Sequence, residues 1–111
     1  MRDDLVVTLG GQTYAVECPW GTLPDGQTFG PVSQLAVDSQ DRVYVFQRSN
    51  PPVLVFDPDG TLVDSWGEGE FSDAHGIFIN RDDLVLLVDR DAHQILRSEE
   101  RRVGKECRSR W

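Results

Sequence analysis

Short apolar stretches alternate with short polar turns along this chain. Residues 35–37, 43–46, 53–56 and 62–66 are rich in β-branched, aromatic and other apolar side chains, and residues 39–41 and 57–60 are polar clusters between them. Apolar runs this short, bounded by turns, favour strands over helices. In the turn at 57–60, Pro58 pre-sets φ and Gly60 tolerates a positive φ. Because the pattern contains no convincing amphipathic helix, the chain is predicted to be all-β.

The same pattern occurs twice. Within residues 34–56, the stretch 34–54 matches residues 76–96 after a shift of 42 positions, and no gap is needed. The matched pairs are Leu35 with Ile77, Val37 with Ile79, Asp41 with Asp83, Val43 with Val85, Arg48 with Arg90 and Val53 with Ile95. Self-similarity with a period of about forty residues is typical of blade arrays and other repeat folds.

Four strands within one period favour a β-propeller over a β-sandwich. We therefore expect an all-β fragment, about one and a half blades, of a propeller with four-stranded antiparallel blades. Residues 32–66 would be blade one. Residues 67–96 would be a truncated blade two, with two strands, the start of a third at 94–96 and no outer strand. Residues 1–31 would form an N-terminal hairpin, from segments 5–9 and 14–17, and a linker whose residues 19–30 cross one face as an ordered loop.

The last fifteen residues, 97–111, read RSEERRVGKECRSRW and resemble a translated sequencing adapter. We therefore expect them to be a non-native tail without a structure of its own. On this interpretation residues 1–96 are the opening piece of a longer propeller. The last strand of blade two would then expose unpaired N–H and C=O groups, and we expect the chain to associate through that edge.

The charge of the chain changes once this tail is set aside. The whole chain has a formal net charge of −8, and the tail holds six basic and three acidic residues, which leaves −11 on residues 1–96. Phosphate repels so acidic a protein, which argues against nucleic acid and anionic membranes as partners. The charge does not exclude a small-molecule or peptide substrate.

Targeting signals are not visible either. No signal peptide or transmembrane run stands in the sequence, so the localisation stays unknown. Cys18 is the only cysteine before the tail and cannot form a disulfide within residues 1–96.

Two histidines are candidates for chemistry. His75 precedes the first strand of blade two, where a neutral imidazole would point at the central channel and could bind zinc. On the residues alone, a role as a plain loop or channel-lining residue is favoured over zinc binding. His93 begins the third strand of blade two and is interpreted as structural.

Arg48 ends the second strand of blade one. Its planar guanidinium suits bidentate contact with a carboxylate or an oxyanion. The alternative is a structural salt bridge, with Asp89 or Asp91 as the partner. The arginine at the equivalent repeat position, Arg90, favours that structural role.

The strings VDSQDRVYVFQR, VLVFDPDG, WGEGEFSDAHGI and DRDAHQIL resemble NHL-repeat propellers. More narrowly, residues 14–96 resemble peptidyl-α-hydroxyglycine α-amidating lyase and its bacterial relatives. Two short motifs carry this narrower resemblance. The family's F-x-x-P-H-G falls on FSDAHG and its F-x-R falls on FQR, which places His75 and Arg48 at site positions. Ala74 stands where the family has proline, which loosens the loop that aims the histidine.

The resemblance implies a six-bladed propeller with two metals. It implies a zinc ion held by three histidines, one of them His75, and a structural calcium bound by the backbone carbonyls of Leu35 and Ile77. It implies that Arg48 steadies negative charge while peptidyl-α-hydroxyglycine is cleaved to a peptide amide and glyoxylate. The other zinc ligands and an active-site tyrosine would lie beyond residue 96, so the fragment itself is expected to be inactive and to hold neither metal tightly. The alternative is a non-enzymatic NHL-repeat propeller that serves as a binding or scaffold module.

Overall fold

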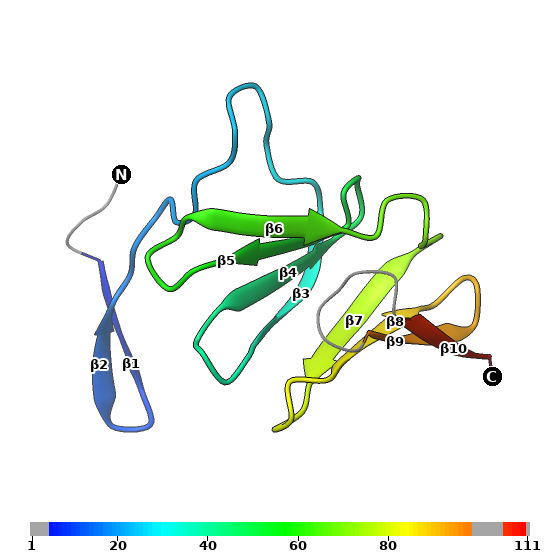
Figure 1. Ribbon diagram of the computed structural model, residues 1–111. Coiled ribbons are helices and arrows are strands. Elements are labelled where there is room, and N and C mark those ends of the chain that lie inside the picture. Colours follow the sequence, from blue (N-terminus) through cyan, green and yellow to red (C-terminus); the bar gives the residue numbers. More distant parts are fainter. Residues whose placement is uncertain (1–4, 99–105, 111) are drawn as a thin grey trace.

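The computed structural model describes residues 5–98 and 106–110, which form strands and no helix (Figure 1). The strands are β1 (Val6–Leu9), β2 (Gln12–Ala15), β3 (Val32–Val37), β4 (Val43–Gln47), β5 (Val53–Phe56), β6 (Leu62–Trp66), β7 (Ala74–Ile79), β8 (Val85–Asp89), β9 (Gln94–Ser98) and β10 (Glu106–Arg110). They make one hairpin, β1-β2, and two four-stranded sheets, β3-β4-β5-β6 and β10-β9-β8-β7. All these strand pairs are antiparallel, so the prediction of an all-β fold with four-stranded antiparallel, propeller-like sheets is confirmed.

The first sheet is apolar on both faces. Successive side chains of a strand point to opposite faces, so Val45 and Leu54 pair on one face while Tyr44 and Val55 pair on the other. When both faces of a strand are covered, the side chains on both faces are buried, so polar and apolar residues do not alternate along it. For this reason all four residues of β5 are buried, and its sequence is the continuous apolar run VLVF.

The second sheet contains a strand that we did not expect. We expected its outer strand to be missing and residues 97–111 to have no structure, but β10 pairs with β9 from Glu106↔Ser98 to Arg110↔Gln94. Backbone N–H and C=O groups at a sheet edge can pair with any extended segment, whatever its side chains. The repeat therefore supplies three strands of this sheet, and the adapter-like segment supplies the fourth.

The 42-residue repeat is reproduced in detail by the turns that follow β3 and β7. In each turn one side-chain oxygen accepts hydrogen bonds from the amides two and four residues further on: Asp38 from Gln40 and Arg42, and Asn80 from Asp82 and Leu84. Asp41 and Asp83 have φ values of 62° and 64°. Aspartate tolerates this left-handed conformation better than most residues, which explains why it recurs at this position.

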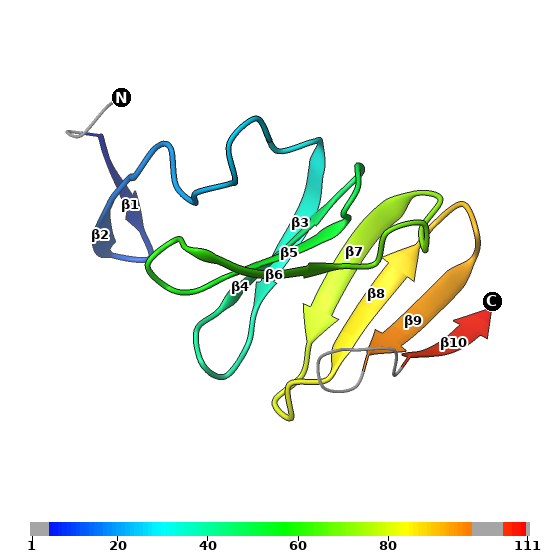
Figure 2. The same ribbon diagram turned by 45° about the horizontal axis from the view of Figure 1, so that its top comes forward.

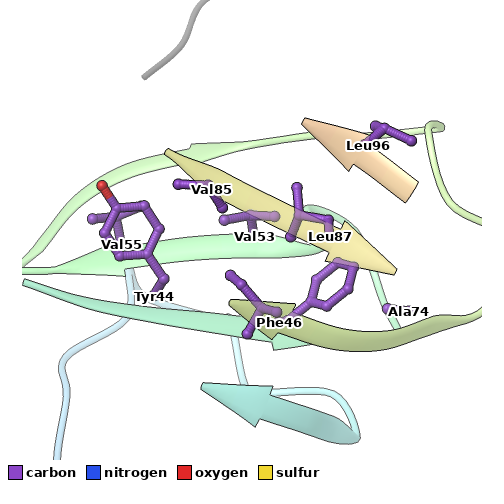
Figure 3. Packing of buried hydrophobic residues seen from close by; sticks show 9 residues of the cluster. Tyr44, Phe46, Val53, Val55, Ala74, Val85, Leu87 and Leu96 are labelled. Atoms are coloured by element: carbon purple, nitrogen blue, oxygen red, sulfur yellow. The ribbon is translucent and has the colours of Figure 1, made fainter. Parts of the chain in front are cut away.

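The two sheets pack face to face around one apolar core (Figures 2 and 3). The buried residues are Tyr44, Phe46, Val53 and Val55 from the first sheet, and Ala74, Ile77, Val85, Leu87 and Leu96 from the second. The inner strands β3 and β7 make the closest contact between the sheets. Removal of this apolar surface from water is the main force that holds the two repeats together.

The linker crosses the other face of the first sheet. Trp20 and Leu23 pack against a second buried cluster, which consists of Val45, Leu54 and Phe56. The rings of Trp20 and Phe29 lie 5.6 and 5.8 Å from the ring of Phe56. The linker is therefore an ordered loop on this face, as predicted. In the hairpin that precedes it, every side chain of β1 and β2 is exposed.

Candidate functional site

Arg48 follows β4 and reaches across to the second repeat. Its Nε lies 3.1 Å from Asp73 Oδ1 and donates a 3.1 Å hydrogen bond to the carbonyl of Ala74. Its two terminal nitrogens donate no hydrogen bond to another described residue. The prediction that Asp89 or Asp91 is the partner of Arg48 was wrong. Because β3 packs on β7, the loop before β7 lies over the end of β4, and this loop carries Asp73.

Asp73 also binds a second arginine. Arg90 Nη2 lies 3.1 Å from Asp73 Oδ2, and the aspartate side chain is largely buried between the two guanidinium groups. A weaker contact of 3.7 Å joins Arg90 to Asp91. One carboxylate thus ties the loop before β7 to the ends of both β4 and β8.

Asp89, the last residue of β8, holds the same loop from within. Its buried carboxylate accepts hydrogen bonds from the amides of Ser72 and Asp73, at 2.7 and 2.9 Å. In the first repeat Gln47 takes the equivalent place and accepts the amide of Gly30 at 2.9 Å. Because these donors satisfy the carboxylate, Asp89 is a structural residue.

A small pocket opens where the two repeats meet. Its volume is about 140 Å³, and its lining includes Arg48, Ser49, Asn50 and Asp73. Pockets for drug-sized ligands span roughly 300–1,000 Å³. This pocket therefore suits a small polar group, such as a carboxylate, better than a whole peptide.

The two histidines lie apart from this pocket's lining. His75 belongs to β7 rather than preceding it, and it occupies a bulge where the pairing with β8 shifts between Ala74 and Gly76. Its side chain is exposed. His93 has a φ of 54° and lies in the turn before β9.

These positions bear on the expected zinc. Within the described residues, no group of three or more His, Cys, Asp and Glu side chains is placed to hold a metal ion. A catalytic zinc takes about three protein ligands. The described residues supply one candidate, His75, so by themselves they do not fit a zinc ion.

Leu35 and Ile77 lie at equivalent points of the inner strands β3 and β7. The amide of Ile77 donates a 2.8 Å hydrogen bond to Oε1 of Gln34, away from β8, and the carbonyl of the same residue points to the same side. In β3 the amide of Asp38 points to β4, so by alternation the backbone of Leu35 points to the free edge. The two carbonyls are thus available to a ligand. They are two of the roughly six to eight oxygens that calcium takes.

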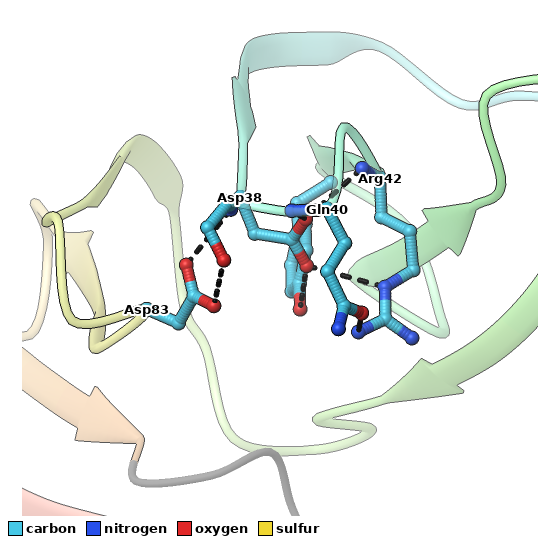
Figure 4. A network of polar contacts seen from close by, with 6 residues as sticks. Asp38, Gln40, Arg42 and Asp83 are labelled. Atoms are coloured by element: carbon cyan, nitrogen blue, oxygen red, sulfur yellow. Dashed lines mark hydrogen bonds and ion pairs between the residues drawn. The ribbon is translucent and has the colours of Figure 1, made fainter.

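Several residues that join the repeats were missed by sequence reasoning. The hydroxyl of Ser33 donates a 2.5 Å hydrogen bond to the Ala74 carbonyl. Asp83 accepts the amide and the hydroxyl of Ser39 at 2.9 and 2.6 Å (Figure 4). The match of Asp83 with Asp41 was the one available signal, and it indicated a turn rather than a contact between repeats.

Compared with models of known protein families and with curated proteins, the chain matches none of them. Its described part contains no helix with the length and apolar character that a membrane span requires.

Proposed function

We propose that this chain is part of an NHL-repeat propeller of the peptidyl-α-hydroxyglycine α-amidating lyase type, in which Arg48 binds the substrate. The geometry of Arg48 carries the proposal. Its Nε is held by Asp73 and by the Ala74 carbonyl, while its two terminal nitrogens donate no hydrogen bond to another described residue and the side chain borders the polar pocket. The anchoring carbonyl belongs to the residue before His75, so both motif residues stand at one junction between the repeats.

The reaction breaks the C–N bond of a carbinolamide and releases a peptide amide and glyoxylate. A guanidinium that is already fixed through Nε can stabilise the negative charge that develops on oxygen without reorganising. In a longer propeller, His75 would be one zinc ligand, and the carbonyls of Leu35 and Ile77 would be two of the calcium ligands. The further ligands would come from other blades.

Binding of a substrate model tests the role of Arg48. We expect benzoyl-α-hydroxyglycine to bind weakly to this chain and to shift the guanidinium resonances of Arg48 in an NMR titration. Arg48→Gln should abolish the shifts. Arg97→Gln removes an equal charge from an exposed position outside the pocket lining and should leave the titration unchanged. Equal titrations for Arg48→Gln and the unmodified chain would refute the proposal.

The expected zinc affinity provides a second test. Because the described residues offer one candidate histidine ligand, His75, where about three ligands are needed, we expect no stoichiometric zinc binding at submicromolar concentrations. Isothermal calorimetry of the chain and of His75→Ala should give the same weak heats. A tight one-to-one isotherm that His75→Ala removes would show that the chain forms a zinc site by itself.

A non-enzymatic binding module is the second candidate function. It is favoured by an apolar groove of about 390 Å³ on the outer face of the first sheet, lined by Trp20, Phe29, Val32, Leu35, Val43 and Val45. Glyoxylate release by a longer form of the protein, lost on Arg48→Gln, would favour the lyase. A longer form without such activity would favour the binding module.

A further inference from the structure

The side chains that the second sheet buries against the first have equivalents on the outer face of the first sheet. The residues of the second sheet that are buried against the first include Ile77, Val85, Leu87, Leu96 and the partly buried Ile79. Their equivalents 42 positions earlier are all apolar and lie together on the outer face of the first sheet: Leu35, Val43, Val45, Leu54 and Val37. We call this surface the head face. It repeats, on the first sheet, the surface that the second sheet buries.

The opposite end of the molecule carries the complementary surface. Phe78 pairs with Leu86 and Val88 pairs with Ile95 on the outer face of the second sheet, which we call the tail face. These four residues are equivalent to Ala36, Tyr44, Phe46 and Val53, which the first sheet presents to the second. Phe78 is 59% exposed, although it is the largest side chain of the four. The tail face is therefore an apolar surface without a partner among the described residues.

The turns at the edges of the two faces, which we call the rim, carry opposite charges. Across the observed interface, the carboxylate of Asp83 accepts hydrogen bonds from the amide and the hydroxyl of Ser39, a contact that we call the Ser39–Asp83 clasp. In the repeat, Asp41 is equivalent to Asp83 and Arg81 is equivalent to Ser39. If a tail face packed on a head face as the two sheets do, Asp41 of the head face would therefore meet Arg81 of the tail face. Both side chains are exposed, and neither has an ion-pair partner among the described residues. The rim of the head face therefore carries an acid, and the rim of the tail face carries a base at the matching position.

We propose that the tail face binds the part of the head face that the linker leaves open on a second copy of this chain, with β7 of one copy against β3 of the other, as β3 lies against β7 between its own two sheets. The Asp41–Arg81 complementarity and the repeat equivalence of the two faces identify this occupant. The linker covers Val45 and Leu54 of the head face but leaves Leu35 and Val37 of β3 about half exposed. The inner strand β3 is also the part of the first sheet that lies closest to β7 in the observed interface. The proposal does not depend on the lyase function.

Such an interface is head-to-tail, so each copy still offers one free face after binding. Association of this kind closes into a ring or grows into a filament, and it does not stop at a symmetric dimer. Propellers close at about four to eight blades, so a ring of two-sheet chains would hold roughly two to four copies.

Complementation between two blocked variants tests this arrangement. Phe78→Asp blocks the tail face and Leu35→Asp blocks the head face, and both residues are exposed, so each variant should keep its fold by circular dichroism. In sedimentation velocity the unmodified chain should form oligomers, and each variant alone should be monomeric. A mixture of the two variants should form a one-to-one dimer and nothing larger. Val63→Asp, which changes an exposed valine on β6 outside both faces, should associate as the unmodified chain does.

The rim pair is tested by a double-mutant cycle. Asp41→Asn keeps a residue that tolerates the left-handed conformation, and Arg81→Gln keeps a long polar side chain. For an exposed ion pair, each single change should weaken association about two- to five-fold, and the double variant should be no weaker than the single ones.

Three results would overturn the proposal. A chain that stays monomeric up to its solubility limit would show that the faces do not bind each other. Self-association of Leu35→Asp through its intact tail face would indicate a symmetric interface. Association unaffected by both Phe78→Asp and Leu35→Asp would point to pairing of strand edges instead.

Discussion

Arg48 and Arg90 stand at equivalent positions of the repeat, yet both bind the same carboxylate, that of Asp73. Pro31 occupies the position of Asp73 in the first repeat and offers no acceptor side chain. The similarity of the two repeats therefore does not extend to their contacts here. Arg48 has the structural role that the residues alone left open, because its Nε contacts Asp73 and the Ala74 carbonyl.

Loss of Asp73 should loosen the junction between the repeats. Asp73→Ala removes both arginine contacts, and because the two guanidinium groups are about half exposed we expect a loss of about 1–2 kcal/mol in the free energy of unfolding. Urea denaturation measures it. Asp91→Ala removes a 3.7 Å contact between exposed groups and should cost less than about 0.5 kcal/mol. Equal losses for the two variants would contradict this role for Asp73.

Asp59 should make part of the stability depend on pH. Hydrogen bonds from the amide of Thr61, and then from its hydroxyl, lower the pKa of the Asp59 carboxyl below its usual value. A carboxyl whose pKa is lower in the folded state stabilises the fold fully above its unfolded-state pKa, and this contribution disappears as the pH falls through the folded-state pKa. Between neutral and acid pH the unmodified chain should therefore lose more stability than Asp59→Asn. An NMR titration of Asp59 with an ordinary midpoint would refute this.

At the scale of elements, the strands could be predicted because each is encoded by its own residues and their turns. The predicted segment 62–66 is the strand β6, and 43–46 and 53–56 lie in β4 and β5. The predicted hairpin is present, although its second strand is Gln12–Ala15 instead of residues 14–17. The strand β10 could not be predicted, because no apolar pattern specifies it and its pairing uses backbone groups at the edge of β9.

The core between the sheets should set the stability of both. Leu87 of β8 is fully buried between the sheets, so Leu87→Ala should cost about 2–5 kcal/mol through lost burial and the cavity left behind. Leu9→Ala makes the same change at a residue of β1 that is 64% exposed and should stay within about 0.5 kcal/mol of the unmodified chain. Thermal and urea unfolding measure both. A small effect of Leu87→Ala would mean that the sheets do not depend on each other.

At the scale of the whole molecule, the pairing of β10 protects one edge of the second sheet. A chain that ends after Ser98 would leave the outer edge of β9 unpaired, and an unpaired edge is a template for aggregation. We expect this shorter chain to aggregate faster and at lower concentration than the unmodified one, as measured by light scattering and thioflavin fluorescence. A chain that lacks only Trp111 keeps β10 and serves as the control. Equal aggregation of the shorter chain and the control would show that β10 does not shield the edge.

The positions of strands and turns, the 42-residue period and the left-handed aspartates follow from the chain's own pattern, because each depends on side chains that are close together in sequence. The partner of Arg48, the Ser39–Asp83 clasp and the pairing of β10 arose only from packing, because each joins residues that come together when strands stack or meet at an edge. The head and tail faces stand between these two cases. Their apolar residues are visible in the repeat, but the burial of β3 against β7 decided which side of each sheet is covered and which is left open.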